Sequence, residues 1–107
     1  MSGSEIIDLG EVSQIPSGES RCFEIRGRRI AVFHLKDGGV RAVDDLCSHA
    51  EASLAAGEVE DMCVVCPWHG AKFSLETGEA LAPPATEGVR AYDVLVESGR
   101  LQLEWKV

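Results

Sequence analysis

The chain reads CSHAEASLAAGEVEDMCVVCPWHG over residues 47–70, and this stretch contains two cysteine–histidine pairs. Cys47 and His49 have one residue between them, and Cys66 and His69 have two. A cysteine and a histidine this close in sequence can face one metal centre only if the backbone curls, because same-face side chains of a strand run parallel. The stretch therefore predicts two loops, each offering one thiol and one imidazole to a shared metal group.

The residues beside the second pair favour such a loop. Pro67 fixes one φ angle, and Gly70 allows the backbone to come close to a bulky group. Two thiolates and two imidazoles suit tetrahedral zinc, for which two cysteines and two histidines form a closed ligand set. The same side chains also suit a [2Fe–2S] cluster with two cysteines on one iron and two histidines on the other. Ligand chemistry alone leaves both metal groups open at this point.

Outside the two pairs, apolar and polar residues alternate with the period of a β-strand. The clearest case is the end of the chain, where Leu101, Leu103 and Trp105 alternate with charged or polar residues, as in a strand buried on one face. Turn residues near Gly27 and at positions 37–39, 77–78 and 97–99 separate neighbouring strands. The remaining predicted strands cover residues 5–9, 20–25, 28–36, 40–45, 58–65, 72–75, 79–81 and 89–97.

Two segments that follow strands do not read as strands themselves. Residues 47–57 are small and rich in alanine, and residues 66–71 contain a proline and a glycine. Functional residues concentrate on such loops when a rigid scaffold holds them. Residues 82–85, with two prolines, are too proline-rich for a central strand. We therefore expect one all-β domain over residues 1–107, an antiparallel sandwich or barrel-like fold with metal-binding loops at about 46–57 and 65–71 and a proline loop at about 82–86.

The formal net charge of −8 on 107 residues limits the partners that the chain can bind. It disfavours nucleic acids, whose phosphates need a positive surface, and fits docking on proteins with positive patches. No apolar run approaches the length of about 18 residues that a membrane span needs, and the first ten residues do not resemble a secretory signal. Four cysteines would allow two disulfides, but cysteines clustered with histidines in a reducing compartment more often bind metal. We expect a soluble, cytoplasmic monomer.

The motif residues resemble the two cluster-binding loops of Rieske proteins, which read C-x-H and C-P-x-H-G. Cys47-Ser48-His49 and Cys66-Pro67-Trp68-His69-Gly70 match these loops. The similarity is close over roughly residues 40–90 and is greatest to the stand-alone Rieske ferredoxins that serve bacterial aromatic-ring dioxygenases. It also includes Ser53-Leu54, Gly57, Phe73, Thr77-Gly78 and Pro83-Pro84.

This resemblance implies a Rieske-like β-sandwich with a cluster-binding subdomain and one [2Fe–2S] cluster. Cys47 and Cys66 would bind the inner iron, and His49 and His69 the outer iron. The resemblance also implies an electron carrier and not an enzyme, which receives electrons from an NAD(P)H-dependent flavoprotein reductase and passes them to a terminal ring-hydroxylating oxygenase. The chain does not read as the oxygenase itself, because a mononuclear iron site needs two further histidines and only His34 remains.

Departures from the respiratory branch of the family predict a low reduction potential. Respiratory Rieske proteins have an additional cysteine in each loop, joined as a disulfide, and the matching positions here are Ala52 and Trp68. They also have a serine and a tyrosine that donate hydrogen bonds to sulfur, where this chain has Ala71 and Phe73. Missing donors disfavour the more negative reduced state. We expect a midpoint at the lower end of the Rieske range of about −150 to +300 mV.

The remaining cysteines and the third histidine are predicted to be structural. Cys22 reads as a small buried hydrophobe in a strand. Cys63 forms C-x-x-C with Cys66, but its apolar neighbours predict a thiol in the core. His34, with no cysteine nearby, is expected to be structural or at the surface. Trp68 would either shield the cluster from water or form a docking rim with the proline loop.

Two alternative functions stay open at this point. The first is a Rieske-like small subunit of a larger oxidoreductase, such as assimilatory nitrite reductase. Such subunits commonly lack some ligands, and the presence of all four here favours the carrier. The second is an interaction module stabilised by zinc.

Overall fold

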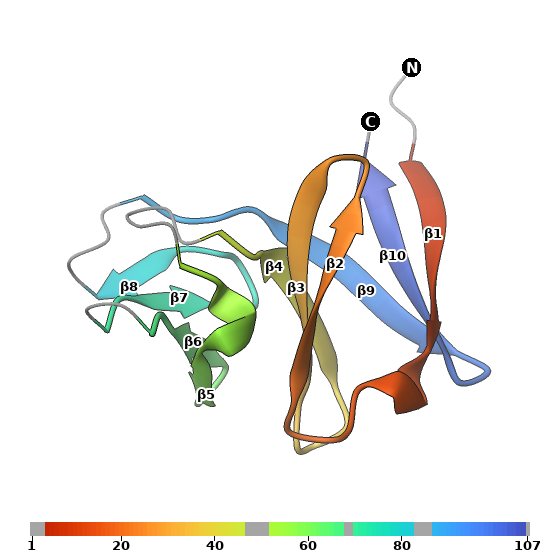
Figure 1. Cartoon of the computed structure of the whole chain (residues 1–107), viewed down its shortest axis with the longest axis horizontal. Helices are drawn as coiled ribbons and strands as arrows, with labels where there is room; N and C mark the ends of the chain where they lie inside the picture. The colour runs from red at the N-terminus through yellow and green to blue at the C-terminus, as the bar shows by residue number, and fades with distance from the viewer. Residues whose placement is uncertain (1–3, 47–51, 68–69, 83–86, 107) are drawn as a thin grey trace.

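The computed structural model describes residues 4–46, 52–67, 70–82 and 87–106, which form two antiparallel sheets (Figure 1). One sheet has six strands in the order β1-β10-β9-β4-β3-β2, and the other has four in the order β5-β6-β7-β8. The strands are β1 (Ser4–Glu11), β2 (Ser20–Ile25), β3 (Arg28–His34), β4 (Val40–Asp44), β5 (Glu58–Glu60), β6 (Cys63–Val65), β7 (Lys72–Ser74), β8 (Ala80–Ala82), β9 (Ala91–Glu97) and β10 (Arg100–Lys106). Two short 3-10 helices are η1 (Val12–Gln14) and η2 (Leu54–Ala56). The expected all-β fold is confirmed.

The inner face of the six-stranded sheet encloses the first of two apolar cores. Leu101 and Leu103 of β10 are completely buried there, together with Ile30 and Val32 of β3. The alternation read from the end of the chain therefore places the apolar face of β10 inward, as predicted. Figure 1 shows β1 and β10 facing β2 and β3 across this core.

Both faces of β3 are buried, and its side chains contribute to the apolar cores on either side. The strand thereby connects the two sheets. Ile30 and Val32 belong to the first core, whereas Ala31 and Phe33, which point the opposite way, belong to the second. The second core also contains Val64 of β6 and Phe73 of β7. The four-stranded sheet is thus packed on the outer side of β3 and β4, on the left in Figure 1.

The predicted strand over residues 58–65 was wrong, because a tight turn divides it into β5 and β6. Asp61 and Met62 adopt positive φ angles of 45° and 65°, and Val59 pairs with Val64 across the hairpin. Asp adopts positive φ angles more readily than most residues, but Met does not. Only one of the two turn residues therefore indicated this hairpin turn in the sequence. Within the segment predicted as a loop over residues 47–57, η2 forms one short helical turn.

The other predicted strands agree with the structure to within two residues at either end. The turn at Gly27 is confirmed, since Arg26 and Gly27 link β2 and β3 with positive φ angles of 51° and 82°. Two consecutive positive φ angles suit the right-handed twist of a two-residue hairpin. Among the described residues, no helix is long and apolar enough to cross a membrane.

Candidate metal centre

Cys66 is the one predicted ligand that the described residues include. It follows β6 directly and is 1% exposed, and it belongs to the second core with Ala71 and Phe73. The other three predicted ligands, Cys47, His49 and His69, lie outside the described residues. The geometry that can be assigned is therefore that of Cys66 and of the backbone at the base of each loop.

The second loop is closed by strand pairing at its base. Val65 pairs with Lys72, and one step further the Cys66 amide donates a hydrogen bond of 2.7 Å to the carbonyl oxygen of Ala71. Gly70 has a φ angle of 74°, which glycine adopts at little cost. The loop predicted over residues 65–71 is thus the tip of the β6–β7 hairpin.

The first loop is closed in the same way. Leu46 and Ser53 form an isolated antiparallel bridge, and the Leu54 amide donates to the Asp45 carbonyl oxygen at 2.7 Å. The chain therefore leaves the end of β4 and returns beside Leu46 at Ser53, seven residues later. The two sides of this base lie next to each other, whatever the path of the chain between them.

A buried carboxylate fixes the base of the first loop. Asp45 is 0% exposed, and its Oδ1 accepts hydrogen bonds from the Ser53 hydroxyl at 2.7 Å and the Ala55 amide at 2.9 Å. Its Oδ2 lies 3.0 Å from Nη2 of Arg29, an ion pair without the alignment of a hydrogen bond. Because Asp45 sits on one side of the loop and Ser53 and Ala55 on the other, this one side chain ties both sides together.

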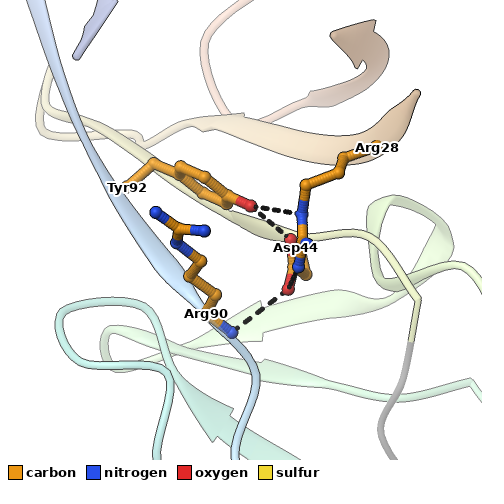
Figure 2. Close-up of polar contacts among 4 residues, drawn as sticks. All are labelled: Arg28, Asp44, Arg90 and Tyr92. Carbon is orange, nitrogen blue, oxygen red and sulfur yellow. Dashed lines mark hydrogen bonds and ion pairs between the residues drawn. The ribbon is translucent and has the colours of Figure 1, made fainter. Parts of the chain in front are cut away.

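The neighbouring Asp44 ties the end of β4 to β3 and β9 (Figure 2). The Tyr92 hydroxyl donates to Asp44 Oδ1 at 2.6 Å, and Arg28 Nη2 donates to Oδ2 at 3.0 Å. Arg28 Nε also donates to the Tyr92 oxygen at 3.0 Å, and the Arg90 amide approaches Asp44 Oδ2 at 3.4 Å. The strand that leads into the first loop is thereby fixed on both sides.

The network alters the acidity of the tyrosine. Burial raises the pKa of Tyr92, and its hydrogen bond to Asp44 raises that pKa further, while Arg28 acts in the opposite direction. The hydrogen bond to Asp44 raises the pKa of the Arg28 guanidinium, which stays charged throughout the accessible pH range. The Asp44–Tyr92 pair therefore keeps the phenol protonated to a higher pH in the folded protein than in the unfolded chain.

The two loops are held side by side through backbone contact. A Cβ atom on Gly57 would lie 2.2 Å from the carbonyl oxygen of Val65, the residue before Cys66. Only glycine allows the chain returning from the first loop to pass so close to β6. Ala52 and Leu54, from the first loop, share the second core with Cys66. The predicted convergence of the two loops is thus supported at their bases.

A third segment packs against the far end of the same sheet. The Val89 amide donates to the Gly78 carbonyl oxygen at 2.8 Å, and a Cβ on Gly78 would lie within 2 Å of the Val89 carbonyl oxygen. The predicted Thr77-Gly78 turn is therefore present, and the chain that enters β9 packs against it. Of the proline loop predicted at about 82–86, Ala82 is instead the last residue of β8, and residues 83–86 lie outside the described residues, as does Trp68.

The surroundings of Cys66 fit an iron–sulfur cluster. A thiolate among apolar side chains is costly to bury unless a positive group compensates its charge, and a metal core supplies that charge. Ala71 and Phe73, both completely buried, have no hydroxyl group to offer to sulfur. Among the described residues, Cys22, Cys63 and Cys66 form no disulfide with one another.

Two of the predictions for the other cysteines were wrong. Cys63 and Cys22 are each only partly buried. Cys63 is the first residue of β6, where the strand has just left an exposed turn, and its apolar neighbours gave a misleading signal. The prediction for His34 is confirmed, because its Nδ1 lies 2.6 Å from the carbonyl oxygen of Ile15 and so connects β3 to the segment after η1.

The sequence analysis missed Asp44 and Asp45 as residues that position the site. A signal was present, since two consecutive carboxylates end an otherwise apolar strand immediately before a predicted ligand loop. Their partners, Arg28, Arg29 and Tyr92, are far away in sequence, and no local pattern indicated them.

Comparison with known proteins gives a consistent result. The model of the Rieske [2Fe–2S] domain matches residues 5–93. A ferredoxin subunit of 3-phenylpropionate/cinnamic acid dioxygenase from Photorhabdus laumondii is 44% identical over 93 residues, which is 86% of this chain and 87% of that protein.

Solved structures agree with this match. The ferredoxin of carbazole 1,9a-dioxygenase from Nocardioides aromaticivorans superimposes with a TM-score of 0.85 at 31% identity, over 92% of this chain and 95% of that one. A second similar structure is a complex of reduced oxygenase and oxidized ferredoxin in carbazole 1,9a-dioxygenase. It gives a TM-score of 0.82 at 26% identity, over 92% of this chain and 91% of that one.

The raised pKa of Tyr92 predicts a loss of stability in alkaline solution. Because the folded-state pKa lies above the unfolded value of about 10, the contribution is complete below that pH and is lost as pH rises through the folded value. Tyr92→Phe should lower the free energy of unfolding by about 1.5–3 kcal/mol at neutral pH, the cost of a hydrogen bond to a charged group. Urea unfolding at pH 7 and above pH 10 measures both effects. A variant with the same alkaline loss as the wild type would contradict this assignment.

The close approach at Gly57 predicts that a single methyl group disturbs the site. Gly57→Ala should cost about 1–3 kcal/mol of stability, because its Cβ meets backbone that cannot rotate away. It should also lower the iron bound per chain. Gly39→Ala is the matched control, since its added Cβ would meet side chains and no backbone, with Asp37 Oδ1 at 3.2 Å and Leu35 Cδ1 at 3.8 Å. Equal iron content in both variants would show that the Gly57 contact does not position the loops.

Proposed function

The chain belongs to the Rieske [2Fe–2S] domain family, and from that membership we propose that it is a one-electron carrier of an aromatic-ring dioxygenase system. It accepts electrons from an NAD(P)H-dependent flavoprotein reductase and delivers them to a terminal ring-hydroxylating oxygenase. The observation that supports this most strongly is 44% identity, along most of both chains, to a dioxygenase ferredoxin subunit. The structurally similar carbazole dioxygenase ferredoxin forms a complex with its oxygenase, which supports the second partner.

The proposed ligands are Cys47 and Cys66 for one iron and His49 and His69 for the other, in the arrangement typical of Rieske centres. When bound, the cluster supplies a site that takes up and releases one electron. The protein contributes the buried Cys66 sulfur and two loops whose bases are fixed by hydrogen bonds. The hydrogen bond between the Cys66 amide and the Ala71 carbonyl oxygen holds the backbone beside this sulfur, so Cys66 should move little between redox states.

We also propose that the carrier has a low potential. Ala71 and Phe73 are completely buried in the same core as Cys66, in the two positions from which respiratory relatives are expected to donate hydrogen bonds. Without these donors the reduced cluster gains no stabilisation at its sulfurs. A low potential suits electrons that originate from a nicotinamide and pass through a flavin.

The cellular setting of the proposal is the cytoplasm, where the reductase finds its nicotinamide. We further propose that residues 1–107 act as a single domain and a monomer. A Rieske-like small subunit of a nitrite reductase type of enzyme is the rival function, and it requires a tight complex with a catalytic subunit. A zinc module is the other rival, and it requires a colourless protein.

A reconstituted electron-transfer chain tests the proposed function. Purified protein should be red-brown, should contain two irons per chain, and should show the electron paramagnetic resonance signal of a cluster with mixed nitrogen and sulfur ligands when it is reduced. With a flavoprotein reductase, NADH and a dioxygenase oxygenase component, the protein should support product formation. Cys66→Ser should abolish both the colour and this activity, while Cys63→Ser, outside the proposed ligand set, should keep them. A colourless wild type that binds zinc would contradict the proposal.

Adding a hydroxyl group at either Ala71 or Phe73 is predicted to raise the reduction potential of the cluster. Ala71→Ser and Phe73→Tyr should each shift the midpoint upward if the new hydroxyl reaches sulfur, by about 60 mV for every 1.4 kcal/mol gained by the reduced state. Tyr92→Phe, which removes a hydroxyl from the first core, should leave the midpoint nearly unchanged. Redox titration followed by circular dichroism measures these shifts. A wild-type midpoint above about +150 mV would contradict the low-potential assignment.

A further inference from the structure

An arginine-rich hollow lies where β3 and the segment before β9 meet the base of the first loop. Its volume is about 530 Å³, and Arg28, Arg29 and Arg90 line it together with Asp44 and Leu46. Arg28 and Arg29 are the first two residues of β3, and Arg90 directly precedes β9. Residues far apart in sequence therefore line the same hollow. We call this feature, defined by its three arginines, the arginine hollow.

The three guanidinium groups are held in place before any partner binds. Arg28 is hydrogen bonded to both Asp44 and Tyr92, and Arg29 is paired with Asp45. The Arg90 guanidinium carbon lies 5.2 Å from the centre of the Tyr92 ring, and Figure 2 shows the Arg90 side chain beside that ring. It also lies 5.9 Å from the centre of the Trp105 ring. Side chains that are ordered in advance lose less entropy on binding.

The charge that this hollow presents to solvent is positive. The side chains of Arg28 and Arg29 are 47% and 55% exposed, whereas those of their partners Asp44 and Asp45 are 18% and 0% exposed. The Arg90 guanidinium stacks on the Tyr92 and Trp105 rings, and Arg90 also lines a small neighbouring pocket with Asp93 and Glu104. A positive patch of this kind is unexpected on a chain with a net charge of −8.

The hollow also adjoins the proposed cluster site. Leu46, on its lining, directly precedes the proposed ligand Cys47 and is 51% exposed. Arginine and exposed apolar side chains in one recess are the composition of an interface centre, where single residues contribute most of the binding energy. A partner bound here would therefore lie beside the base of the first proposed ligand loop.

We propose that the arginine hollow binds a carboxylate-bearing segment of the terminal oxygenase and orients the carrier on it. This inference rests on the proposed function, and it identifies the surface with which the carrier would bind its oxygenase. The excess of acidic residues on the rest of the chain suits positive patches of a partner, whereas a partner carboxylate is attracted to the arginine hollow, so the two kinds of charge together orient the carrier. The arrangement therefore favours productive encounters over others.

Arg90 is the residue to change, because Arg28 and Arg29 also hold Asp44 and Asp45 at the base of the first loop. Arg90→Glu should weaken binding of the loaded carrier to its oxygenase at least tenfold, with a weaker salt dependence, as measured by surface plasmon resonance. Arg90→Lys keeps the charge and should retain most of the affinity. Arg100→Glu makes the same change in net charge at the far end of β9, where Arg100 lies opposite Glu97 in the strand register and its side chain pairs with Asp8, and it should change affinity less than twofold.

The outcomes separate this inference from the proposed function. The visible spectrum of each variant verifies that the cluster is loaded, and reduction by the reductase should change less than twofold for Arg90→Glu. Equal oxygenase affinity of Arg90→Glu and wild type, or tighter binding of the variant, would overturn the inference while the carrier function stands. Impaired reduction by the reductase with normal oxygenase binding would also overturn it, because the occupant would be the other partner. A loaded wild type that passes electrons to no oxygenase would instead contradict the proposed function itself.

Discussion

The buried carboxylate of Asp45 is the interaction on which the site depends. It accepts hydrogen bonds from the hydroxyl of Ser53 and the amide of Ala55, and it pairs with Arg29 of the neighbouring strand. A loop tied at both sides in this way has little freedom at its base, even though its tip is built from small residues. The second loop needs no such side chain, because the pairing of β6 with β7 closes it directly. The two proposed ligand loops are thus held by different physical means.

Much of the fold follows from local patterns. The strand β2 covers exactly the residues expected from alternation, and the hairpin at Gly27 follows from a glycine between two apolar runs. The ligand motifs identified both loops, because cysteine and histidine at short spacing require curled backbone. The turn at Asp61–Met62 was not predictable in the same way, since a methionine with a positive φ angle is stabilised by the pairing around it and not by its own preference.

The connections between distant segments were beyond the reach of the sequence alone. Nothing in the pattern around Asp44 points to Tyr92, forty-eight positions later, or to Arg28. Likewise, the exposure of Cys63 depends on how a neighbouring turn packs, which hydrophobic neighbours do not reveal. Patterns with a short period locate strands and loops, whereas polar networks between strands appear only when the chain is folded.

The burial of β3 on both faces also has a consequence for how the protein unfolds. Because Ile30 and Val32 serve one core and Ala31 and Phe33 the other, neither core can open without exposing the shared strand to water. The domain should accordingly melt as one cooperative unit, with the amide protons of β3 among the slowest to exchange with solvent. Thermal damage to the sandwich and release of iron would then be a single event.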